Sequence, residues 1–152
     1  MFKVASEERM GGSVTPYWPG ITRDVLARAP GFRNDDRAYA AWIAQRLIQP
    51  AVLDAVESLG CGALLTCTSD GVDDAAVTWV SPGALRLAAY RLRELILQRA
   101  PETLAIVASY AANANGLDEP SDELCSDLED VAAIADFSAR TGASVMTLAA
   151  NW

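Results

Sequence analysis

Apolar residues recur at helical spacing in several separate segments of this chain, and prolines and glycines stand between those segments. The clearest segment begins at Ser81, a helix-capping residue, continues with Pro82 and runs to Pro101. Its apolar residues share one face of a helix: Leu85, Ala88, Ala89, Leu92, Leu95 and Ile96. A chain built from such segments is expected to fold by packing amphipathic helices around a common core.

The same pattern predicts five further helices. They cover residues 22–29, a stretch from Asp35 or Asp36 to Leu47, residues 50–59, residues 102–112, and a last long helix that begins at Asp118 to Pro120 and ends before Gly142. In the helix at 102–112 we expect the inward residues to be Leu104, Val107 and Ala108. In the last helix the apolar face is predicted to carry Leu124, Leu128, Val131 and Ala135, and the opposite face Asp122, Ser126, Glu129 and Asp130.

Three short segments are rich in residues that favour strands. Residues 63–69 and 75–80 flank Asp70-Gly71-Val72-Asp73-Asp74, which predicts a hairpin over about 63–80 rather than a cation-binding loop, since the spacing is not that of an EF-hand. Residues 143–149 alternate in character and predict a possible third strand. The expected fold is a helix-dominated α+β domain with five or six helices and a small sheet. An all-α fold is the alternative, because short apolar runs also occur in buried helices.

Length and hydropathy indicate one globular domain over residues 1–152. No run approaches the roughly 18 apolar residues of a membrane span. The first twelve residues include Lys3, Glu7, Glu8 and Arg9 where a secretory signal would be apolar. We therefore predict a cytoplasmic protein with no membrane partner.

The residues that most enzymes rely on are scarce. The chain has no histidine, which removes the commonest general base and the commonest zinc ligand. Its three cysteines, Cys61, Cys67 and Cys125, form no C-x-x-C pair and are best read as buried thiols. No phosphate-binding or dinucleotide motif is present. We therefore expect no enzyme activity, no catalytic residue, no cofactor and no metal site.

Net charge is confined to the last third of the chain. Residues 1–99 contain 11 acidic and 11 basic side chains, whereas residues 100–152 contain 9 acidic residues and Arg140 as the single basic one. A chain of net charge −8 repels nucleic acid and favours a basic protein partner. The predicted partner-binding residues are the eight clustered acids and one aromatic residue: Asp118, Glu119, Asp122, Glu123, Asp127, Glu129, Asp130, Asp136 and Trp18.

Each part of that prediction has an alternative. The acidic residues are equally consistent with a solvated helix face, or with neutralisation inside the fold by the arginines of the helix at 82–99. Those arginines are Arg86, Arg91, Arg93 and Arg99. Trp18 stands between Pro16-Tyr17 and Pro19, where it can act as a binding anchor or fold back over the core.

In size, acidity and lack of catalytic residues, the chain resembles the immunity proteins of bacterial toxin–immunity pairs, including those of contact-dependent inhibition systems. The run Trp79-Val80-Ser81-Pro82, leading into Leu85, Ala88 and Leu92, is similar to elements of such domains. The resemblance implies an inhibitor that occludes a basic, nuclease-like toxin. The alternative is a structural or regulatory subunit, one form of which is a homodimer, in which the acidic face provides solubility. The sequence leaves the oligomeric state open.

Overall fold

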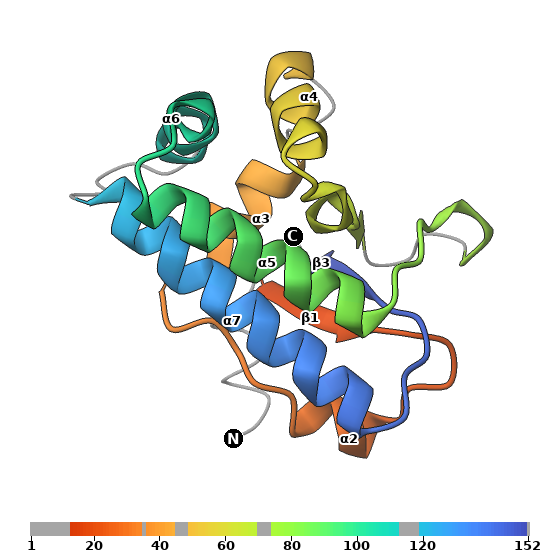
Figure 1. Ribbon diagram of the computed structural model, residues 1–152. Coiled ribbons are helices and arrows are strands. Elements are labelled where there is room, and N and C mark those ends of the chain that lie inside the picture. Colours follow the sequence, from red (N-terminus) through yellow and green to blue (C-terminus); the bar gives the residue numbers. More distant parts are fainter. Residues whose placement is uncertain (1–12, 35, 45–48, 70–73, 113–118, 152) are drawn as a thin grey trace.

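The protein is a helix-dominated α+β fold, as the sequence predicts (Figure 1). The computed structural model describes residues 13–34, 36–44, 49–69, 74–112 and 119–151. Its helices are α2 (Arg23–Ala27), α3 (Asp36–Ala44), α4 (Pro50–Ser58), α5 (Pro82–Leu97), α6 (Leu104–Ala112) and α7 (Pro120–Arg140). Short 3-10 turns lie at Gly62–Leu65, Asp74–Ala76 and Pro101–Thr103.

Local signals account for where several helices begin. The Thr22 and Ser81 hydroxyls accept hydrogen bonds from the backbone N–H groups of Val25 and Ala84, at 3.2 and 3.1 Å, and so cap α2 and α5. Proline occupies the first turn of α4, α5 and α7, where its missing N–H leaves no helical hydrogen bond unmade. These caps are the reason that the predicted and observed bounds agree closely for these elements.

A three-stranded sheet joins the two ends of the described chain. Strand β3 (Thr147–Asn151) lies between β1 (Ser13–Tyr17) and β2 (Thr68–Ser69). It pairs antiparallel with β1, with Ser13 opposite Asn151 and Tyr17 opposite Thr147, and parallel with β2. Strand β1 is an edge strand, which tolerates a proline such as its fourth residue. No strand is predicted from the sequence in this segment.

The predicted hairpin over 63–80 is wrong. Residues 62–65 form a 3-10 turn with Leu64 fully buried, β2 pairs with β3 instead of with residues 75–80, and the predicted connection at 70–73 lies outside the described residues. The two segments meet through a side chain, because the Thr66 hydroxyl donates to the Thr78 carbonyl at 2.5 Å. The backbone of β2 pairs with β3, and this pairing takes the place of the predicted pairing with residues 75–80.

The predicted third strand exists but is displaced along the chain. It covers Thr147–Asn151 rather than 143–149, and the preceding Met146 makes an isolated antiparallel bridge with Val80. Thr147, Leu148 and Ala150 are buried, so the strand lies within the core and not on its surface.

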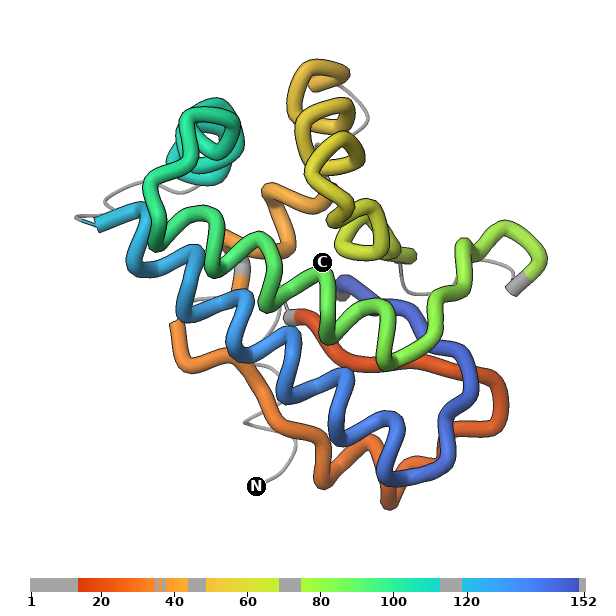
Figure 2. The backbone as a smooth tube through the Cα atoms, viewed as in Figure 1, coloured from red at the N-terminus to blue at the C-terminus, as the bar shows by residue number. Residues whose placement is uncertain are grey.

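Helix α7 is the centre of the fold. It runs antiparallel to α5 along most of its length (Figures 1 and 2), and it also packs against α6, α3 and β1. Coverage on several sides buries eleven of its residues: Leu124, Cys125, Asp127, Leu128, Asp130, Val131, Ala132, Ile134, Ala135, Phe137 and Ser138. The predicted apolar face is confirmed as buried, but the predicted polar face is partly covered too, since Asp130 is buried and Ser126 and Glu129 are half-buried.

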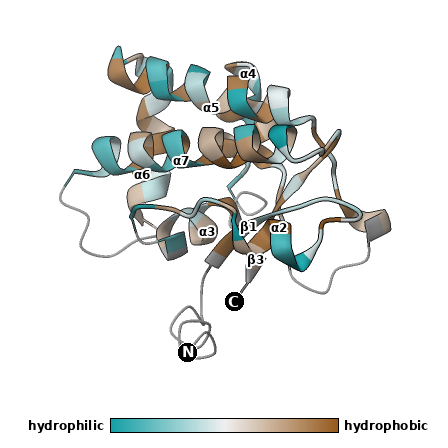
Figure 3. Ribbon diagram, turned by 90° about the horizontal axis from the view of Figure 1, so that it is seen from below, coloured by the Kyte–Doolittle hydropathy of each residue, from teal (hydrophilic) through white to brown (hydrophobic). Residues whose placement is uncertain are grey.

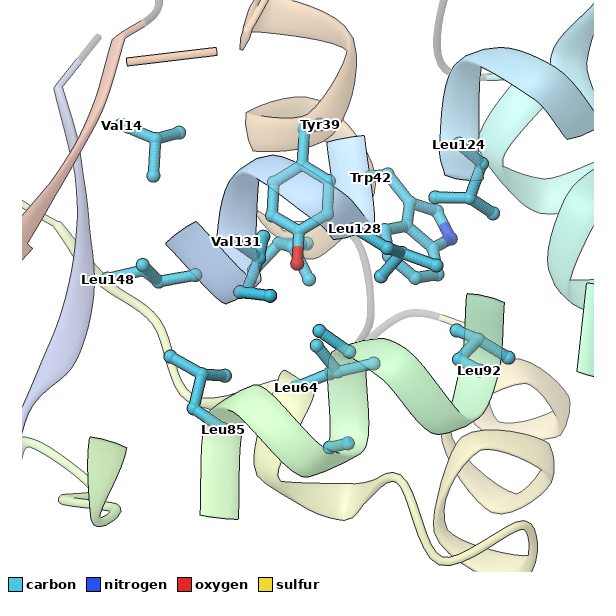
Figure 4. Packing of buried hydrophobic residues seen from close by; sticks show 14 of the residues in the cluster. Val14, Tyr39, Trp42, Leu64, Leu85, Leu92, Leu124, Leu128, Val131 and Leu148 are labelled. Carbon is cyan, nitrogen blue, oxygen red and sulfur yellow. The ribbon is translucent and has the colours of Figure 1, made fainter. Parts of the chain in front are cut away.

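Aromatic side chains from three elements fill the core beside α7. Tyr39 packs against Phe32 and Trp42, with ring centroids 5.2 and 5.7 Å apart, and Trp42 meets Tyr110 edge-on at 6.0 Å. Tyr39 and Trp42 lie close to Leu128 and Val131 of α7 (Figure 4). The Tyr39 hydroxyl is buried without a hydrogen-bond partner among the described residues.

The predicted inward face of the helix at 102–112 is wrong at Leu104 and Ala108, which are exposed, whereas Val107 is partly buried and packs against the core. In α6 the buried residues are Ile106, Ser109 and Tyr110, whereas Leu104 is 70% exposed. Nearly every residue of this helix is apolar, so the apolar pattern does not define a face. Two polar hydrogen bonds orient the helix instead. The Ser109 hydroxyl donates to Gln49 Oε1 at 2.6 Å, and the Tyr110 hydroxyl bonds to Asp127.

Hydrophilic and hydrophobic residues are interspersed along α5 and α7 (Figure 3). In the part of the chain that the structure describes, none of the helices combines the length and apolar character needed to cross a membrane.

Because α7 lies at the centre of the fold, we predict that truncating one of its buried side chains lowers the free energy of unfolding. Replacing fully buried Leu128 with alanine should lower the free energy of unfolding by about 2–5 kcal/mol, because the cavity adds to the lost apolar burial. Leu104→Ala, at a 70% exposed site, should change it by less than about 0.5 kcal/mol. Urea denaturation followed by tryptophan fluorescence compares the two. Equal losses would contradict the described core.

Candidate binding surface

The acidic residues predicted to bind a partner are distributed over three environments along α7. Asp118 lies outside the described residues, Glu119 and Asp122 are exposed, and Glu123 is half-buried. Asp127 and Asp130 are buried, and Glu129 and Asp136 are bonded to arginines of the same chain. The cluster is therefore continuous in sequence but not on the surface.

Arg33 binds the middle of α7 from the connection that leads into α3. Its Nε donates to Asp130 Oδ1 at 2.8 Å, and its backbone N–H donates to the other oxygen of the same carboxylate, also at 2.8 Å. Its Nη2 reaches Glu129 Oε1 at 2.8 Å and the Ser126 carbonyl at 3.0 Å. These four hydrogen bonds fasten a segment nearly a hundred residues away onto the central helix.

Arg93 of α5 approaches Glu129 from the other side. Its Nε donates to Glu129 Oε2 at 2.7 Å, and its Nη1 lies 3.1 Å from Glu94. Hydrogen bonds from Arg33 and then Arg93 lower the pKa of Glu129 below its ordinary value. Internal neutralisation by an arginine of the helix at 82–99, one of the sequence alternatives, thus occurs at Glu129 through Arg93, with Arg33 as an additional and unpredicted donor.

Asp127 is fully buried and belongs to a separate polar cluster. The Tyr110 hydroxyl donates to its Oδ2 at 2.5 Å, and the Asn34 amide donates to its Oδ1 at 3.3 Å. Burial raises the pKa of Asp127 to about 7, even though both hydrogen bonds act in the opposite direction. Asp127 and Asp130 are therefore shielded from a partner, which corrects the predicted set of binding residues at these two positions.

Three exposed or half-exposed carboxylates remain at the beginning of α7. We call Glu119, Asp122 and Glu123 the acidic corner. No guanidinium among the described residues lies within ion-pair distance of these carboxylates, whereas Asp136 at the far end pairs with Arg140 at 2.9 Å. Part of their charge interacts favourably with the positive end of the helix dipole.

Trp18 does not form an exposed anchor. It is 7% exposed and belongs to the core cluster, which favours the second sequence alternative, in which this ring covers the core. The neighbouring Tyr17 stacks on Trp79, with ring centroids 5.9 Å apart. The proline-flanked segment therefore closes the sheet against the core instead of presenting aromatic residues to a partner.

The cysteines occupy positions suited to packing. Cys61 is fully buried, and burial raises the pKa of its thiol, so a reactive thiolate is disfavoured there. Cys125 is also buried, and burial likewise raises its pKa. Within the described ranges, no group of three or more cysteine, aspartate or glutamate side chains is arranged to hold a metal ion.

Sequence reasoning missed Arg33, Asn34 and Tyr110, the residues that determine which acids stay exposed. Arg33 and Asn34 stand outside any helix, in a segment with no motif, and Tyr110 falls in a helix whose face the apolar pattern does not define. The sequence signal for these residues is indirect. When a long acidic helix is buried, its carboxylates require hydrogen-bond donors from elsewhere in the chain.

Comparisons with protein families, with curated protein sequences and with solved structures found no match to this chain.

The Arg33 contacts lead to a prediction about stability. Arg33→Ala should lower the free energy of unfolding by about 1–3 kcal/mol, because buried Asp130 loses its charged donor. Arg140→Ala removes an exposed i,i+4 pair and should lower it by only about 0–0.5 kcal/mol. Chemical denaturation at pH 7 measures both. A loss in Arg33→Ala of less than about 0.5 kcal/mol would contradict the stabilising role of Arg33.

Asp127 should make stability depend on pH in the direction opposite to that of an ordinary ion-paired aspartate. Because its pKa is higher in the folded chain, the folded state binds the proton more tightly. The stabilisation that comes from protonated Asp127 is complete below the unfolded pKa of about 3.9 and is lost as pH rises through about 7. Between these two pKa values the free energy of unfolding falls by roughly 1.4 kcal/mol per pH unit at most.

The variant Asp127→Asn removes this titration and keeps an oxygen that can accept from Tyr110. Unfolding free energies of the variant and the wild type are compared at pH 5, 6, 7 and 8. The stability of the variant relative to the wild type should rise with pH up to about 7 and then level off. Asp136→Asn, the same change on an exposed residue of α7, is the control. A constant difference for Asp127→Asn would contradict the raised pKa.

Proposed function

We propose that this chain is a non-enzymatic acidic binding protein, an immunity-type inhibitor that occludes a basic, nuclease-like toxin domain. One observation carries the proposal: the net charge of −8 lies in the last third of the chain, and the acidic corner presents exposed carboxylates of that segment without internal partners among the described residues. A nuclease cleft is basic because it binds phosphates, and it is therefore complementary to such a surface.

The proposed contact surface is smaller than the acidic segment. Glu119, Asp122 and Glu123 contact the partner, while the carboxylates of Glu129 and Asp130 are already bonded to Arg33. Internal pairs do not alter the net charge, so the long-range attraction of a basic protein remains. The exposed corner then determines where that protein docks.

The resemblance to immunity proteins, which supports the inhibitory role, rests on two properties: the chain lacks the usual catalytic residues, and it carries a net charge of −8. A chain without histidine and without a cofactor motif is poorly equipped for the usual hydrolytic mechanisms. A stoichiometric inhibitor needs neither, because it acts by covering the active site of its target.

A second candidate is a structural or regulatory subunit that associates through apolar helix surface. The observation that favours it is the exposure of large apolar side chains on α5, where Leu87 is 69% and Leu97 51% exposed. A basic partner that binds one-to-one per chain and loses its activity favours the inhibitor, whereas an assembly that is indifferent to basic proteins favours the subunit.

The acidic corner can be tested by neutralisation. The triple variant Glu119→Gln, Asp122→Asn, Glu123→Gln should bind a basic partner at least about tenfold more weakly at low salt, since rim charges act mainly through steering and salt-dependent attraction. The partner is captured from the host with the wild-type chain, purified, and titrated by calorimetry at low and high salt. Its nuclease activity is assayed in the same mixtures.

The matched control removes three exposed acids elsewhere, Asp24→Asn, Asp54→Asn and Glu57→Gln, and so changes net charge equally. It should retain most of the affinity. Equal weakening in both variants would show that net charge acts without a defined site. Binding independent of salt, or a bound partner that keeps its activity, would contradict the inhibitor proposal.

A further inference from the structure

Helix α5 carries a second row of apolar residues on the side away from the core. Leu87 is 69% exposed, Tyr90 40% and Leu97 51%. With Glu94 they stand at positions i, i+3, i+7 and i+10, the spacing of a seam along which one helix packs on another. We call Leu87, Tyr90, Glu94 and Leu97 the outer row.

The fold leaves the apolar side chains of this row uncovered, although Glu94 is ion-paired with Arg93 of the same helix at 3.1 Å. The packing of α5 on α7 buries its other side, which includes Leu85, Leu92 and Ile96. Two leucines and a tyrosine aligned along one helix face form an apolar row that a partner surface can bury. The outer row is thus a helix face whose apolar side chains are exposed to solvent in the single chain.

The charges beside the row are complementary to those of a second copy in an antiparallel arrangement. If two α5 helices cross a twofold axis level with Leu92, Leu87 of one copy lies opposite Leu97 of the other, and Tyr90 lies opposite Glu94. Arg86, whose guanidinium sits 5.2 Å from the centre of the Tyr90 ring, then lies beside Glu94 of the second copy. A parallel arrangement instead brings the two Glu94 carboxylates together, which is unfavourable.

We propose that the outer row is the contact surface of an antiparallel homodimer, formed by α5 helices around a twofold axis. The proposal is independent of the acidic corner and goes beyond the binding function. Because a single 16-residue helix spans only about 24 Å, the interface is small and the dimer is expected to be weak.

Sedimentation equilibrium between about 5 and 500 µM tests the proposal, since a weak dimer must appear within that range. The average mass should rise from monomer toward dimer. Leu87→Glu and Leu97→Glu should each raise Kd at least about tenfold by placing a charge in the apolar contact. Both sites are exposed, so the variants should fold, which circular dichroism checks. The control Ala133→Glu adds the same charge at an exposed position of α7 and should leave Kd unchanged.

A charge exchange tests the antiparallel arrangement. Arg86→Glu and Glu94→Arg should each weaken the dimer, and the double variant should recover most of the affinity because the pair is restored with its signs reversed. A wild-type chain that stays monomeric at about 500 µM would overturn the proposal, as would a Kd unaffected by Leu87→Glu and Leu97→Glu. Failure of the double variant to recover would overturn the antiparallel pairing. None of these variants alters the acidic corner, so binding of a basic partner is scored separately.

Discussion

The burial of α7 on several sides is the constraint on which the other polar contacts depend. A 21-residue helix in the centre of a domain this small cannot turn all of its acids to water, so the acids on covered sides require donors within the fold. Arg33, Arg93 and Tyr110 supply them from three different elements. The resulting contacts connect the segment before α3, helix α5 and helix α6 to one helix, and they specify where each of those elements lies.

This arrangement separates two roles of the acidic segment. Glu129 and Asp130 stabilise the fold through ion pairs with Arg33 and Arg93, two arginines from the charge-balanced part of the chain. The protein therefore keeps its full net charge while presenting few acids near any one point of α7. Long-range attraction depends on the total charge, whereas docking depends on the acids that remain accessible.

The sequence predicted the helices well because their signals are local. Thr22, Ser81 and the prolines at helix starts act within one turn of the residue that they cap. The sheet was only partly predictable: the alternation over residues 143–149 indicates a strand near β3, but no local pattern indicates that it pairs with β1, more than a hundred residues away. The sequence predicted that the last third of the chain is acidic, but not which of its acidic residues are exposed. Its exposed portion depends on Arg33, which no local pattern connects to α7.

The two surfaces of the protein should respond to salt in opposite directions, and this follows from charge alone. Two copies that each carry −8 repel one another, so screening by salt favours contact between their α5 helices, where apolar side chains dominate. A basic partner is attracted by the same charge, and screening weakens its approach to the start of α7. A chain with one apolar helix face and one acidic corner can thus favour its own copy at high ionic strength and a basic protein at low ionic strength, without any change in its fold.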